Sequence, residues 1–160
     1  TMFSFTCASY NDKASIPIQY TYRSVVGGKN TSPGFVWTDP PVNTKSFALS
    51  IIDPHPVANN WVHWFVINIP FRERKLVEGA SRTSSLPAGA KELMNSYSEL
   101  GYGGPAPPPG SGQHPYVATL YALNVDRLNL GVDSSLRQFQ KAIEGKVIAE
   151  AKVTGYYERK

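Results

Sequence analysis

The sequence predicts one β-rich domain, spanning residues 1–160, with a minor helix near its C-terminus. Three observations predict this class. The length of 160 residues is that of one ordinary domain. Most segments are short and rich in β-branched and aromatic residues, and 13 glycines and 13 prolines separate them. One stretch alone has the apolar spacing of an amphipathic helix.

Six segments have the character of strands. Residues 2–7 and 18–22 are short and partly alternating, and turn-forming residues follow the second of them at 27–30 and 32–34. Residues 46–52 and 62–69 are nearly continuous apolar runs, which is typical of strands covered on both faces. Residues 116–125 and 147–157 are the longest candidates. The mixed segment 81–93 predicts a loop with at most a short turn.

The helix is predicted near residue 140. Asp133 or Ser134 can cap its N-terminus, and Gly145 stands where a helix ends. Its apolar stripe consists of Leu136, Phe139, Ala142 and Ile143. The chain shows no internal repeat and no second composition, so no domain boundary is expected.

Composition excludes several classes of protein. A hydrophobic fraction of 41% against 18% charged residues excludes a disordered chain. No apolar run approaches the roughly 18 residues of a transmembrane helix, so no membrane span is expected. The single cysteine, Cys7, excludes an internal disulfide and a zinc site made of cysteines. Together with a start that lacks the order of a signal peptide, it predicts a cytoplasmic protein.

The net charge of +4 comes from 16 basic and 12 acidic residues that are scattered along the chain. Nucleic-acid binders usually gather their positive charge on one stripe or interleave it with exposed aromatic residues. We therefore expect no nucleic-acid partner, and at most a mild attraction for small anions or lipid headgroups.

Two segments hold the three histidines and most of the candidate chemistry. In the first, residues 52–64, an antiparallel hairpin centred near Ala58 would place Asp53 opposite His63 and His55 opposite Trp61. A carboxylate that faces an imidazole fixes its tautomer and raises its pKa. The alternative is that Asp53 only shapes a turn before Pro54 and that His63 is a packed strand residue.

The second segment, residues 101–116, is rich in glycine and proline. It suits neither a helix nor a central strand. The N–H groups of Gly103, Gly104, Ala106 and Gly110 could approach an anion closely, as glycine-rich phosphate-binding loops do. His114 and Tyr116 would then add an imidazole and a phenol from one strand face. The alternative is a stiff linker or a docking site for proline-binding domains.

At these residues the chain resembles the phosphatidylethanolamine-binding protein family, also called the Raf kinase inhibitor protein family, in its compact bacterial and archaeal branch. Asp53-Pro54 followed by Trp61-x-His63 is similar to the family's first motif. The run from Gly101 through Gly110-x-Gly112-x-His114-x-Tyr116 is similar to its second. The likeness covers essentially the whole chain. It implies a mostly β fold of two sheets with Greek-key-like connections and one or two peripheral helices.

The resemblance also implies a small pocket for phosphate or a phosphoryl headgroup. Its ligand-binding residues here would be Asp53, His63, Gly104, Pro105, Ala106, Pro107, His114 and Tyr116, with His55 and Trp61 as additional candidates. His55 stands where the family has a second aspartate, and Pro115 stands where arginine is usual. The implied function is a non-catalytic binding protein without a cofactor, acting as a regulator or inhibitor of a kinase or serine protease and forming a homodimer.

Two alternatives come from other classes. Asp53, His55, His63 and His114 are ligand types that hold Zn²⁺ or Fe²⁺. A hydrolase could use Ser111, although Gly110-Ser111-Gly112 lacks the spacing of a nucleophile elbow and no base is evidently paired with it. An anion held by imidazolium groups would bind more weakly as pH rises, whereas a metal would bind more tightly.

Overall fold

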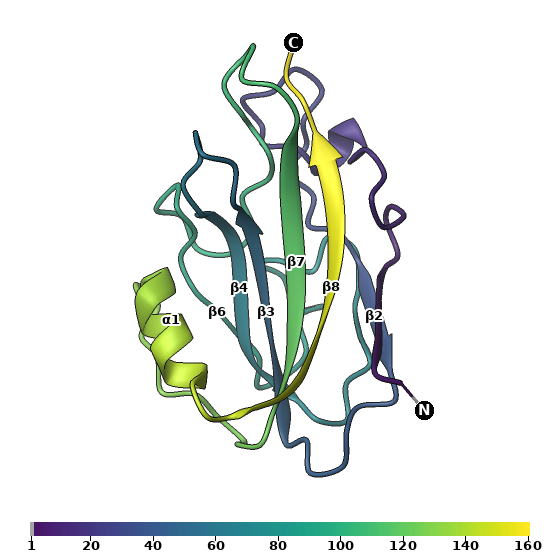
Figure 1. Ribbon diagram of the computed structural model, residues 1–160, viewed down its shortest axis with the longest axis vertical. Coiled ribbons are helices and arrows are strands. Elements are labelled where there is room, and N and C mark those ends of the chain that lie inside the picture. Colours follow the sequence, from purple (N-terminus) through teal and green to yellow (C-terminus); the bar gives the residue numbers. More distant parts are fainter. Residues whose placement is uncertain (1) are drawn as a thin grey trace.

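The computed structural model describes residues 2–160. Within them the chain forms two antiparallel sheets and one α-helix (Figure 1). The smaller sheet has the order β1-β2-β5 and the larger one β6-β4-β3-β7-β8. The elements are β1 (Ser4–Cys7), β2 (Phe35–Thr38), β3 (Ser46–Asp53), β4 (Trp61–Pro70), β5 (Lys75–Leu76), β6 (Lys91–Glu92), β7 (His114–Leu123), α1 (Leu136–Ile143) and β8 (Val147–Tyr157). The predicted mostly β class with two sheets is confirmed.

The larger sheet is covered on both faces. One cluster of buried residues fills the space between the two sheets and includes Phe35, Trp37 and Phe47. A second cluster lies on the other face, where Phe139 and Ile143 of α1 pack against Phe65. Figure 1 shows α1 and β2 on opposite sides of the large sheet. This burial explains why β3 and β4 are nearly continuous apolar runs, as the sequence predicts.

The pairing of β3 with β4 differs from the predicted hairpin. Asp53 faces Trp61 rather than His63, and His55 lies beyond the end of β3. The turn is centred one residue earlier, because the N–H groups of Ala58 and Asn59 both donate to the His55 carbonyl. Ile51 then faces Trp64 while Ile52 faces Val62, so His63 is an extra residue in β4, a β-bulge.

One predicted strand was wrong, and three short strands were not predicted. Residues 18–22 form a 3₁₀ turn over Ile18–Tyr20 rather than a strand, since Pro17 fixes the backbone at its start and the Thr21 hydroxyl donates to the Ile18 carbonyl. The short strands β2 and β5 had no sequence prediction, and β6 lies in the segment 81–93 that was predicted as a loop. Their two to four residues are too short to show an alternating pattern.

The helix begins one to two residues later than predicted. Ser135, not Asp133 or Ser134, caps it: its hydroxyl accepts from the Gln138 N–H while the Gln138 side chain accepts from the Ser135 N–H. The buried side chains of Phe139 and Ile143 belong to the predicted stripe. Gly145 has the positive φ, 76°, that commonly follows a helix end. Among the helices of residues 2–160, none is long and apolar enough to cross a membrane.

Candidate functional site

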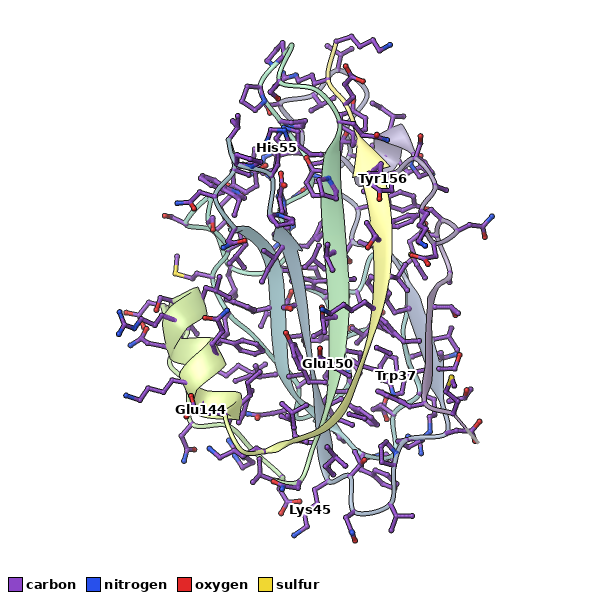
Figure 2. The ribbon with its side chains drawn as sticks, viewed as in Figure 1. Trp37, Lys45, His55, Glu144, Glu150 and Tyr156 are labelled. Atoms are coloured by element: carbon purple, nitrogen blue, oxygen red, sulfur yellow. The ribbon has the colours of Figure 1, made fainter. Side chains whose placement is uncertain are left out.

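A cavity of about 300 Å³ opens at one end of the large sheet, where three neighbouring strands meet. There β3 ends and its antiparallel neighbours β4 and β7 begin. Figure 2 shows His55, just after β3, at the opposite end of the molecule from Lys45, just before β3. The cavity is lined by Asp53, Val57, Ala58, Trp61, His63, Tyr97, Ala106, Pro107, Pro108, His114 and Tyr116. Two segments that are far apart in the sequence thus share one wall, which carries Asp53, His63, His114 and Tyr116.

His114 has both ring nitrogens engaged within the protein. Its Nδ1 lies 2.6 Å from Asp53 Oδ2, and its Nε2 lies 2.9 Å from the Ser111 hydroxyl. Both His114 and Asp53 are buried. The other oxygen of Asp53 accepts the His55 N–H at 2.9 Å. Asp53 therefore both shapes the turn and fixes the His114 ring, and it does not pair with His63 as the predicted register implied.

His63 is also buried, but its hydrogen-bond partners differ from those of His114. Its Nδ1 lies 2.7 Å from the carbonyl oxygen of Gly103, which can only accept, so Nδ1 carries the proton. Burial lowers the pKa of His63 from 6.5 to about 4, against the weaker opposing effects of the Gly103 carbonyl and the Asp53 charge. The Asp53 charge raises this pKa, as expected of a nearby carboxylate, but burial lowers it by more, so the ring is neutral at physiological pH.

His55 packs on His114 without lining the cavity. The two imidazole rings stack with centroids 3.8 Å apart and an interplanar angle of 7°. The Nδ1 of His55 accepts the Val57 N–H at 3.1 Å, so the ring closes the turn. Trp61, the other additional candidate, does line the cavity, and its indole N–H is buried without a partner in the described part of the chain.

The glycine-rich loop uses most of its N–H groups internally. Gly103 donates to the His63 carbonyl, Gly104 to the Asn30 side chain and Gly110 to the Arg159 carbonyl. Of the four predicted donors only the Ala106 N–H has no partner in residues 2–160. The loop therefore does not present the predicted set of free N–H groups to an anion.

The predicted rim of the pocket divides into two halves. Ala106 and Pro107 line the cavity together with Pro108, whereas Gly104 and Pro105 lie away from it. The Pro105 carbonyl accepts the Tyr22 N–H at 2.9 Å. Gly104 packs directly on the backbone of Tyr20, where a Cβ would come within 2.2 Å of the carbonyl oxygen. These two residues anchor the loop to segment 20–22.

Two tyrosines complete the polar part of the wall. Burial raises the pKa of both the Tyr116 and the Tyr97 hydroxyl, so both stay protonated. Tyr97 donates to the Gly104 carbonyl at 2.7 Å, while the Tyr116 hydroxyl has no hydrogen bond to the described residues. Sequence reasoning missed Tyr97, which follows the segment predicted as loop and belongs to no motif.

The wall carries little positive charge. None of the described residues that line it is a lysine or arginine. Nor do any three His, Cys, Asp or Glu side chains of residues 2–160 gather in a way that could hold a metal ion. The His114 ring nitrogens point at Asp53 and Ser111 rather than at a common point with His63, so this geometry gives the metal alternative no support.

Comparisons with known proteins give a consistent result. A family model described as phosphatidylethanolamine-binding protein matches residues 6–158. A UPF0098 protein of Methanothermobacter thermautotrophicus is 38% identical over 94% of this chain and 95% of its own length, and one of Aquifex aeolicus is 36% identical over 94% and 85%. The crystal structure of Escherichia coli YbcL, described as a new member of the mammalian PEBP family, has a TM-score of 0.93 at 31% identity over the full length of both chains.

Proposed function

Because the chain belongs to the phosphatidylethanolamine-binding protein family, we propose that it is a non-catalytic protein that binds a small phosphate-bearing ligand in the cavity at the end of β3, β4 and β7. The observation that carries this proposal is the meeting of Asp53, His63, His114 and Tyr116 on one wall. A concave cavity that is mostly apolar with a few converging polar groups is the usual form of a small-molecule site.

The polar and apolar parts of the wall suit different parts of such a ligand. The Tyr116 hydroxyl and the Ala106 N–H have no partner in the described part of the chain, so they are available to donate to phosphoryl oxygens. Trp61, Val57 and Pro108 offer apolar contacts to the group esterified to the phosphate. Val57 and Pro108 are exposed, so that group would leave the cavity between them.

The test compares two histidines from the same end of the sheet. His63→Ala removes a polar group from the wall, and His55→Ala removes a ring that does not line it. With methyl phosphate as the probe, we expect His63→Ala to raise the Kd by roughly 10- to 100-fold, the effect of losing a hydrogen bond to a charged group. His55→Ala should change the Kd much less. An equal or larger effect of His55→Ala, measured by calorimetry, would contradict this placement of the ligand.

The biological output is also proposed from family membership. We infer that the ligand-bound protein regulates or inhibits a kinase or a serine protease, that it acts as a homodimer, and that it works in the cytoplasm, as its single cysteine favours. Sedimentation of the purified protein tests the dimer. A monomer at micromolar concentration would contradict it.

One observation favours hydrolysis as a second candidate function. Ser111, His114 and Asp53 are connected in the order of a serine–histidine–carboxylate triad, with distances of 2.9 and 2.6 Å. The sequence had shown no base paired with Ser111. However, the Ser111 hydroxyl also lies 2.7 Å from the Pro108 carbonyl, and Ser111 does not line the cavity. We therefore rank this function second.

An active-site-directed probe separates the two functions. If Ser111 is a nucleophile, its oxygen will attack the phosphorus of a fluorophosphonate, its proton will pass to His114 Nε2, and fluoride will leave. The binding function predicts no covalent adduct by mass spectrometry. An adduct on the wild type that is absent from Ser111→Ala would favour the hydrolase.

A further inference from the structure

The tautomer of His63 decides what its free nitrogen can do. Nδ1 carries the ring proton because its one partner within residues 2–160, the Gly103 carbonyl at 2.7 Å, accepts. In a neutral ring Nε2 is then a bare acceptor. No hydrogen bond from residues 2–160 reaches Nε2, and Nε2 is not among the buried polar atoms left without a partner, which are the indole nitrogens of Trp37 and Trp61. Nε2 therefore opens to the cavity that His63 lines.

We propose that the cavity selects the singly protonated monoanion of a phosphate monoester, whose P–OH donates to Nε2 of His63. This inference rests on the proposed binding function and names the form of the ligand. An unprotonated phosphoryl group has only acceptor oxygens, so it would meet the bare nitrogen lone pair of Nε2 without a proton between them.

The groups around His63 also favour a ligand that brings its own proton to Nε2. Asp53 at the end of β3 is a carboxylate, and His114 on β7 has both nitrogens engaged. Tyr116, also on β7, and Tyr97 contact the His63 ring edge-on, at centroid distances of 5.0 and 6.0 Å. Tyr116 can donate one hydrogen bond, while Tyr97 already donates to Gly104. Neither phenol can transfer a proton to Nε2 at neutral pH, since burial raises the pKa of both.

Charge also opposes the dianion. The lining residues include the Asp53 carboxylate and no lysine or arginine. A dianion would lose its hydration in the cavity without a lysine or arginine to offset the loss, whereas a monoanion loses much less. Burial lowers the pKa of His63 to about 4, so the ring supplies no positive charge between pH 5 and 8. The expectation of imidazolium binding therefore does not hold for His63.

Three probes test the proposal on the whole protein: methyl phosphate, methylphosphonate, whose second pKa is higher, and dimethyl phosphate, which has no P–OH. If only the monoanion binds, the affinity for methyl phosphate falls about tenfold per pH unit above the ligand's second pKa, near 6. For methylphosphonate the same fall begins at a higher pH. Dimethyl phosphate binds about tenfold more weakly than methyl phosphate at pH 5.5, because Nε2 stays without a partner.

The ³¹P chemical shift of bound methyl phosphate is an independent readout that needs no variant. We expect the bound ligand to keep the shift of the monoanion at a pH where the free ligand is already a dianion. In His63→Phe, which lacks the acceptor, the preference for methyl phosphate over dimethyl phosphate should disappear.

The outcomes separate this inference from the proposed function. Binding of methyl phosphate that is constant or strengthens from pH 5.5 to 8, or a bound ³¹P shift of the dianion, overturns the inference and leaves the binding function intact. A fall in affinity that begins at the same pH for methyl phosphate and methylphosphonate also overturns it, because a group of the protein would then be titrating. If none of the three probes binds the wild type at pH 5.5, the binding function fails and the inference fails with it.

Discussion

Two histidines on the same cavity wall have different chemical roles because their partners differ. His114 bonds a carboxylate and a hydroxyl, whereas His63 bonds a carbonyl and has one nitrogen without a partner among the described residues. Both are almost fully buried, so their partners rather than their exposure distinguish them. The β-bulge in β4 places His63 outside the regular pairing with β3, which is how bulges commonly direct a side chain into a site.

At this residue scale, the lowered pKa of His63 predicts a stability that falls with acid. The unfolded chain takes up a proton near pH 6.5, while the folded protein takes it up only near pH 4. Between these values the unfolded state binds more protons, so lowering the pH favours unfolding. The wild type should lose roughly 3 kcal/mol more between pH 7 and 4 than His63→Gln, which does not titrate.

Urea denaturation of both proteins over this pH range measures the difference. Other acidic groups titrate in both proteins and cancel in the comparison. Parallel pH profiles for the two proteins would show that His63 titrates normally in the folded state.

At the scale of elements, the loop of residues 101–110 acts as a fixed part of the wall because it is tied down along its length. Asn30 bonds both the Tyr102 carbonyl and the Gly104 N–H. The Pro105 carbonyl accepts from Tyr22, and the Tyr102 hydroxyl donates to the Tyr20 carbonyl. These contacts hold Ala106 and Pro107 at the cavity and hold the Gly103 carbonyl against His63.

Gly104→Ala tests this anchoring. The added Cβ would lie 2.2 Å from the Tyr20 carbonyl oxygen, so the loop or segment 20–22 must move. We expect a loss of stability at or above the upper end of the usual range of about 1–3 kcal/mol for overpacking, because the three nearest atoms all belong to the backbone of residues 20–22. Methyl phosphate should also bind more weakly, since the Gly103 carbonyl shifts with the loop.

Gly131→Ala is the matched control for this prediction. Its Cβ would meet only the Asp133 side chain, at 3.2 Å, in an exposed loop. Equal stability of the two variants in urea denaturation would show that the loop of residues 101–110 is not held against segment 20–22.

At the scale of the whole molecule, the large sheet separates two clusters of buried residues with different tasks. The cluster between the sheets includes Tyr116 and Tyr102, which reach the cavity wall and its loop. The cluster under α1 includes Phe65 and Phe139, stacked at 4.7 Å, and α1 contributes no residue to the cavity. Stability and ligand binding can therefore be changed separately.

Phe139→Ala tests this separation. Removing a fully buried phenylalanine should cost about 3–5 kcal/mol of stability. The Kd of the folded protein for methyl phosphate should stay unchanged, since the cavity lies at the strand ends. Phe71→Ala, at an exposed phenylalanine, serves as the control and should cost far less. A weaker affinity of Phe139→Ala under conditions where it is folded would contradict the separation.

The sequence by itself determined the elements whose signal is local. The apolar runs of β3 and β4, the 147–157 strand and the stripe of the helix follow from side-chain periodicity and from burial on both faces. The family resemblance of the two histidine-containing motifs also predicted which residues would be brought to one place. The structure brings them together because the antiparallel neighbours β3, β4 and β7 begin or end at the same end of the sheet.

The tertiary structure alone decided the chemistry of those residues. Whether Asp53 would bond His63 or His114 depended on a one-residue shift of the turn and on the bulge at His63, neither of which changes the composition of the strands. Whether Gly104 would donate to a ligand or to Asn30 depended on a contact across 74 residues. The reason is physical: hydrogen-bond partners and the tautomers they fix depend on shifts of about an ångström in distances between segments, whereas periodicity depends only on which face is buried.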